Sequence, residues 1–114
     1  PRTEARGDGP VTWVRVADEG ETEAGKVRVF DLDGRRIALC TTDHGHFAID
    51  DVCTHDGGPL DQGELSGDII ECPRHGARFD VTTGAVKALP AVRPVKTYAT
   101  RVVDGQIEVE IPEG

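Results

Sequence analysis

The chain has 114 residues, of which 37% are hydrophobic and 30% charged, a balance typical of one soluble globular domain. No apolar run comes near the roughly 20 residues that a membrane helix needs, so we expect no membrane-spanning segment. The formal net charge of −8 disfavours a nucleic-acid-binding role, because phosphates repel an acidic surface.

The predicted secondary structure is all-β and begins after a loose polar tail over residues 1–10. Short β-branched runs recur along the chain between turn residues, and no stretch keeps a helical period. These runs predict strands at 11–16, 26–31, 36–41, 46–50, 68–71, 77–81, 95–103 and 107–111. We therefore expect residues 11–114 to form a single domain.

Turn signals separate several of the predicted strands. Asp33-Gly34 and Asp104-Gly105 predict type I′ hairpins, since both central residues of that turn need a positive φ. Residues 43–45 and 82–84 predict further tight turns. The segment 52–67 contains four glycines and a proline, so we expect it to be a loop that interrupts the sheet.

The negative charge is unevenly placed. Eight acids and no Lys or Arg lie between Ile37 and Pro73, while acids and bases are equal in number over the rest of the chain. The eight acids are Asp43, Asp50, Asp51, Asp56, Asp61, Glu64, Asp68 and Glu71. This segment is expected to favour basic protein partners.

Two short segments, Cys53-Thr54-His55 and Cys72-Pro73-Arg74-His75, each supply one thiol and one imidazole. Each lies beside the end of a predicted strand, and sixteen residues separate them. Soft thiolates and borderline imidazoles select iron–sulfur clusters, zinc or copper over magnesium or calcium. We expect Cys53, His55, Cys72 and His75 to bind one metal centre. A structural zinc ion is an alternative, because two Cys and two His also make a tetrahedral set.

The two segments resemble the signature of the Rieske family, which is Cys-X-His, a spacer and then Cys-X-X-His. The likeness continues through residues 53–60 and 72–80, and residues 89–94 resemble the proline-containing loop that covers the cluster in this family. It implies a Rieske-like antiparallel β-sandwich with a cluster-binding subdomain of two loops, and one [2Fe-2S] cluster. In that arrangement Cys53 and Cys72 bind one iron, while His55 and His75 bind the other.

Departures from the family pattern indicate which branch of the Rieske family the chain resembles. High-potential members of respiratory complexes have a membrane anchor and an extra cysteine in each loop, at the positions of Gly58 and Arg74 here. They also have hydroxyl residues at the positions of Ala77 and Phe79, where a hydrogen bond stabilises the reduced cluster. Large oxygenase subunits continue into a mononuclear iron domain, for which this chain has no residues. The resemblance therefore implies a low-potential Rieske-type ferredoxin.

Such a ferredoxin is a one-electron carrier and not an enzyme. The resemblance implies a flavin-dependent NAD(P)H reductase as donor, a terminal non-haem iron oxygenase of a dioxygenase system as acceptor, and no small-molecule substrate. A regulatory or accessory cluster protein, such as a redox sensor or a small oxidoreductase subunit, remains an alternative. Three cysteines and a start without an apolar secretory core favour the cytoplasm.

Several other residues have structural interpretations. Cys40 ends an apolar run and is expected to be a buried small hydrophobe. His44 and His46 flank a turn glycine and are expected to be exposed, and Trp13 is expected to pack in the core. The pair Asp50-Asp51 is either a solvated strand end or part of a docking surface.

Overall fold

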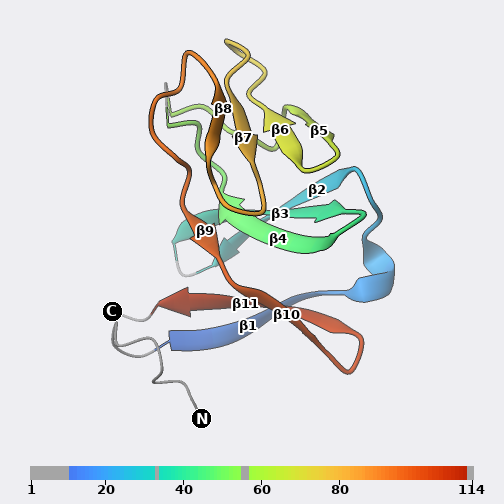
Figure 1. Cartoon of the computed structure of the whole chain (residues 1–114). Coiled ribbons are helices and arrows are strands. Elements are labelled where there is room, and N and C mark those ends of the chain that lie inside the picture. The colour runs from blue at the N-terminus through green and yellow to red at the C-terminus, as the bar shows by residue number, and fades with distance from the viewer. Residues whose placement is uncertain (1–10, 33, 55–56, 113–114) are drawn as a thin grey trace.

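The computed structural model describes residues 11–32, 34–54 and 57–112, so the tail predicted for residues 1–10 lies outside it. Its strands form three antiparallel sheets arranged as successive layers (Figure 1). The first sheet has the order β1 (Val11–Asp18), β11 (Gln106–Pro112) and β10 (Thr100–Val103); the second has the order β2 (Lys26–Leu32), β3 (Arg35–Thr42), β4 (Gly45–Asp50) and β9 (Thr97–Tyr98); the third has the order β5 (Glu64–Ser66), β6 (Ile69–Glu71), β7 (Arg78–Asp80) and β8 (Val86–Ala88). A single 3₁₀ turn, η2 (Glu19–Glu21), follows β1. The all-β prediction is confirmed, and no helix in the described part of the chain is long and apolar enough to cross a membrane.

The second sheet is the central layer, because side chains of β3 are buried on both of its faces. Successive side chains of a strand point to opposite faces. Ile37 packs against the first sheet beside Val109, whereas Ala38 and Cys40 pack on the other face in the cluster that contains the predicted ligand Cys53. The continuous apolar run of β3 is therefore explained by its central position.

The longer predicted strands are confirmed, with bounds that shift by one or two residues, except for the strand at 95–103. That segment divides at Ala99 into β9, which pairs with β4, and β10, which pairs with β11. The chain thus passes from the second sheet to the first within an apparently continuous strand pattern.

Two strands were not predicted. The prediction of a loop over residues 52–67 is wrong at its end, where Glu64–Ser66 forms β5 and pairs with β6. Val86–Ala88 forms β8 beside β7. Both strands have only three residues, too few for a period of two to be recognised. They exist because their neighbours in the third sheet offer hydrogen-bonding partners.

The hairpin predicted at Asp104-Gly105 is confirmed, since the φ angles of the two residues are 53° and 77°. Gly34 also has a positive φ of 82°, while Asp33 lies outside the described residues. The core position predicted for Trp13 is wrong. Trp13 is partly exposed and pairs with Glu110, and the guanidinium carbon of Arg101 lies 4.1 Å from its ring centre. The two-residue period places it on the outer face, opposite to Val14.

Candidate metal centre

The first ligand loop is closed by two main-chain hydrogen bonds. The N–H of Cys53 donates to the carbonyl of Gly58 at 2.7 Å, and the N–H of Gly57 donates to the carbonyl of Cys53 at 2.8 Å. Gly57 has a φ of 78°, a conformation that glycine adopts without steric cost. The predicted ligand His55 and its neighbour Asp56 lie outside the described residues.

The second ligand loop repeats this main-chain design between β6 and β7. The N–H of Cys72 donates to the carbonyl of Ala77 at 2.7 Å, and the N–H of Gly76 donates to the carbonyl of Cys72 at 3.1 Å. Gly76 has a φ of 79° and occupies the position that Gly57 holds in the first loop. Two segments far apart in sequence therefore present a cysteine in the same local geometry.

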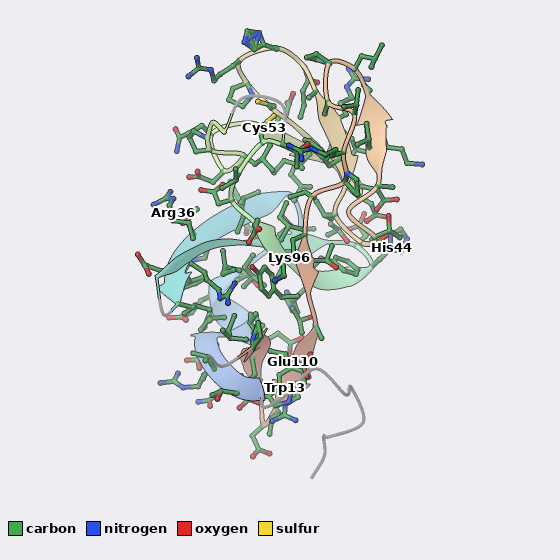
Figure 2. All side chains as sticks on the ribbon, turned by 90° about the vertical axis from the view of Figure 1, so that its left-hand side faces the viewer. Trp13, Arg36, His44, Cys53, Lys96 and Glu110 are labelled. Carbon is green, nitrogen blue, oxygen red and sulfur yellow. The ribbon has the colours of Figure 1, made fainter. Side chains whose placement is uncertain are left out.

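The predicted donors differ in exposure. Cys53 and Cys72 are each 1% exposed and belong to the same buried cluster, whereas His75 is exposed. Figure 2 shows Cys53 in the layer of the third sheet, at the opposite end of the molecule from Trp13. The structure thus brings the two thiols into one interior cluster and leaves the imidazole of the second loop at the surface.

The donor set of the two loops has the chemistry of an iron–sulfur site. Among the residues that the structure describes, no three His, Cys, Asp or Glu side chains gather closely enough to hold a single metal ion. A structural zinc ion needs all its donors within about 2.0–2.3 Å of one point. Two thiolates and two imidazoles distributed over a pair of irons are the donor set of a Rieske cluster. Two buried thiols and an exposed imidazole on the two loops fit the donor chemistry of such a cluster.

The segment predicted to cover the cluster is anchored to the first ligand loop. The hydroxyl of Thr54 donates to the carbonyl of Arg93 at 2.7 Å. Ala91 and Val95 are buried in the cluster that contains both cysteines. The importance of Thr54 was missed from the sequence, because its partner lies 39 residues away and no local pattern links them.

Asp51 lies at the base of the first ligand loop, and its side chain is fully buried. Its carboxylate accepts hydrogen bonds from the N–H of Asp61 at 2.7 Å and from the guanidinium of Arg36 at 3.0 Å. Burial raises the pKa of Asp51 above that of an ordinary carboxyl group. Both alternatives considered for Asp50-Asp51 are therefore wrong for Asp51. Its buried position follows the two-residue period of β4, since it lies two residues after the buried Ile49.

Most described acids of the acidic segment have a local partner, and the positive charges of Arg36 and Arg78 offset part of the attraction expected for a basic protein. The pairs are Asp51 and Asp61 with Arg36, Asp68 with His44, Glu71 with Arg78, and Asp50 with the hydroxyl of Tyr98. Asp43 and Glu64 remain exposed. The formal charge of the segment therefore overstates the field at its surface.

The prediction for Cys40 is confirmed. It is fully buried, and burial together with the charge of Asp51 raises the pKa of its thiol to about 12. His44 is exposed as predicted, with 72% of its side chain accessible. The prediction is wrong for His46, whose side chain is only 13% exposed and whose ring shares a 3.1 Å hydrogen bond with the hydroxyl of Thr41.

Comparison with known proteins identifies the family. A model of the Rieske [2Fe-2S] domain matches residues 12–99. The ferredoxin component of the naphthalene 1,2-dioxygenase system of Pseudomonas putida is 30% identical over 101 residues, which are 89% of this chain and 97% of that protein.

Solved structures agree with this match. The ferredoxin of carbazole 1,9a-dioxygenase from Nocardioides aromaticivorans IC177 is 38% identical with a TM-score of 0.83, over 90% of this chain and 99% of that one. A chain in the complex of reduced oxygenase and oxidised ferredoxin of carbazole 1,9a-dioxygenase is 30% identical with a TM-score of 0.80, over 84% of this chain and 99% of that one. The chain therefore belongs to the Rieske [2Fe-2S] family, and it is a ferredoxin of the kind that serves dioxygenase systems as an electron-transfer component.

Proposed function

We propose that Cys53, His55, Cys72 and His75 would hold the [2Fe-2S] cluster. A Rieske cluster supplies one-electron chemistry when bound. The proposal is supported by the matching hydrogen-bond design of the two loops and by the burial of both cysteines. The backbone around the thiols excludes water, and the exposed His75 provides the contact with solvent and partners.

We infer that this carrier passes single electrons from a flavin-dependent NAD(P)H reductase to a terminal non-haem iron oxygenase. The observation that carries this inference is the exposure of His75 on a loop whose cysteine is buried. An electron partner can then approach the centre from the imidazole side without opening the core. We also propose a cytoplasmic location, which is supported by the free thiol of Cys40 and by the assignment of the other two cysteines as ligands instead of disulfide partners.

The docking face for the oxygenase is proposed at the covering segment, residues 89–94. Leu89 and Val92 are 75% and 77% exposed, whereas no other large apolar side chain among the described residues exceeds 44%. The hydrogen bond from Thr54 to Arg93 holds this segment against the first ligand loop. Exposed apolar groups on a well-anchored segment favour association with a protein surface, because contact removes them from water.

Single substitutions test the ligand assignment. Cys53→Ser, His55→Ala, Cys72→Ser and His75→Ala should each prevent normal cluster assembly, because each removes one donor. The measurements are iron and acid-labile sulfide content, together with the electron paramagnetic resonance spectrum of the reduced protein. Cys40→Ala is the matched control and should retain the cluster. A colourless Cys40→Ala variant beside a normal Cys53→Ser variant would show that the assignment is wrong.

The same measurements separate the cluster from zinc. A protein that binds one zinc ion and contains no acid-labile sulfide would contradict the cluster proposal. The role as a carrier has its own test, in which the reduced protein is mixed with a dioxygenase-system oxygenase and reoxidation is followed by absorbance. Reoxidation no faster than that of the reduced protein alone would contradict the proposed role.

A further inference from the structure

The two ligand loops differ in what holds their ends together. The second loop connects β6 to β7, which pair with each other directly beside it through Glu71 and Arg78. The first loop connects β4 to β5, and these strands belong to different sheets. Because β4 and β5 do not pair, no strand ladder closes the first loop at its base.

A set of side-chain contacts occupies the place of that missing ladder. Asp51 and Asp61 lie at the two ends of the first loop, and the N–H of Asp61 donates to the carboxylate of Asp51 at 2.7 Å. The guanidinium of Arg36 donates to the other oxygen of that carboxylate at 3.0 Å and lies 3.7 Å from the carboxylate of Asp61. The N–H of Asp51 in turn donates to the carbonyl of Arg36 at 2.9 Å. Both ends of the loop are thus attached to one residue of β3.

The burial of the Asp51 side chain costs free energy, so packing alone does not explain a carboxylate at this position. Its side chain is 0% exposed, and one carboxylate oxygen of Asp61 is also buried and has no hydrogen-bond partner among the described residues. A buried carboxylate costs free energy that an apolar residue of similar volume would not. What the carboxylate adds is a double acceptor that joins a main-chain N–H to a guanidinium. An apolar residue cannot make that connection.

We propose that Arg36, Asp51 and Asp61 form a bracket that fixes the two ends of the first ligand loop and thereby positions Cys53 for cluster binding. The inference rests on the proposed ligand role of Cys53. Arg36 and Asp51 are positioning residues: they act on the centre through the loop backbone. The second loop needs no such bracket, because the β6–β7 ladder performs the same task.

Hydrogen exchange of the cluster-loaded protein tests the bracket, with Arg36→Gln as the main variant. The amides of Cys53, Gly57 and Asp61 should exchange roughly tenfold faster in this variant, the size of effect expected when a charged hydrogen bond is lost. The amides of Cys72 and Gly76 should keep their exchange rates. Release of iron to a chelator should accelerate, and the resonance spectrum of the reduced cluster should broaden.

Three further variants complete the test. Arg101→Gln is the matched control, because the guanidinium of Arg101 also donates to a carboxylate, that of Glu108 at 2.7 Å, but Arg101 lies on the first sheet. It should leave both loops unchanged. Arg36→Lys should restore part of the protection, since it keeps the positive charge. Asp51→Asn keeps an acceptor for Asp61 but not the charge, and it should loosen only the first loop.

Two results would overturn the proposal. Equal acceleration in both loops of Arg36→Gln would indicate general loss of stability, and unchanged exchange at Gly57 and Asp61 would show that Arg36 does not hold the loop. Failure of the ligand assignment would show instead as full iron content in Cys53→Ser. That result does not alter the exchange comparison between the two loops, so the two failures are distinguishable.

Discussion

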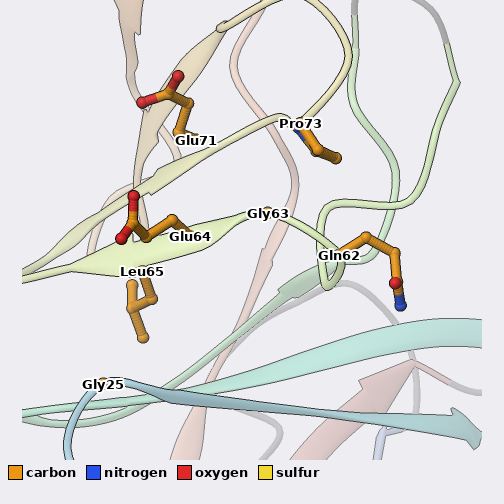
Figure 3. A pocket seen from close by; sticks show the side chains of 7 residues that line it. All are labelled: Gly25, Gln62, Gly63, Glu64, Leu65, Glu71 and Pro73. Carbon is orange, nitrogen blue, oxygen red and sulfur yellow. The ribbon is translucent and has the colours of Figure 1, made fainter.

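Replacement of Gly63 by alanine measures how tightly the two ligand loops are joined. Gly63 precedes β5 beside the strand that leads into the second loop (Figure 3). A Cβ at this position would lie 1.8 Å from the carbonyl oxygen of Glu71, the residue before Cys72. Ordinary contact begins at 3.4 Å, so the two backbones would have to separate by about 1.6 Å. The carbonyl cannot turn away as a flexible side chain could.

The expected loss of stability follows from two contributions. Forcing extra volume into a close-packed site costs about 1–3 kcal/mol. Disruption of a neighbouring main-chain hydrogen bond between β5 and β6 adds about 1 kcal/mol. The entropy of unfolding of a 114-residue chain is about 0.24 kcal/mol per kelvin. A total of about 3 kcal/mol therefore lowers the unfolding midpoint by about 12 °C.

The assay is thermal unfolding of the cluster-loaded protein, followed by far-ultraviolet circular dichroism and by bleaching of the visible absorbance. Gly20→Ala is the control, because a Cβ there meets no atom within 4 Å. Its midpoint should stay within about 2 °C of the parent, since exposed glycine-to-alanine changes have small effects. A Gly63→Ala midpoint as close to the parent as this would refute the argument that separating the two backbones costs about 3 kcal/mol.

Three further outcomes are expected. The reduction potential should be roughly −150 mV, because the hydroxyl donors of high-potential Rieske proteins are absent. Ala77→Ser should raise the potential in a potentiometric titration. A parent value above about +200 mV would contradict the assignment to the low-potential branch of the family. The double change Leu89→Ser and Val92→Ser should lower kcat/KM for the ferredoxin in an oxygenase assay by about tenfold without changing the reduction potential. The control Val103→Ser should leave kcat/KM unchanged. Equal effects of the two would contradict the proposed docking face. The raised pKa of Cys40 means that the folded state keeps a proton that the unfolded state loses, so the free energy of unfolding should fall between about pH 9 and pH 12. Cys40→Ala should remove up to about 1.4 kcal/mol per pH unit of that slope in denaturant titrations, and an unchanged slope would contradict this origin.

The sequence was sufficient for features that depend on neighbouring residues. The ligand motifs could be recognised because thiols and imidazoles at short spacing have few structural uses outside metal binding. The hairpin at Asp104-Gly105 could be predicted because both residues tolerate a positive φ. The longer strands were predicted from their own period. The assignment of all four ligands stays a prediction, because His55 lies outside the described residues.

Other features were decided by partners far along the chain. β5 and β8 are too short to be recognised alone and exist through pairing with β6 and β7. The division at Ala99 follows from which sheet accepts each half of the segment, and the burial of Asp51 depends on Arg36 and on the N–H of Asp61. The two-residue period of a strand shows which of its side chains share a face, but it does not show which residue of another segment lies opposite to them. Only the tertiary structure supplies the partner that makes a buried carboxylate stable or a three-residue strand form.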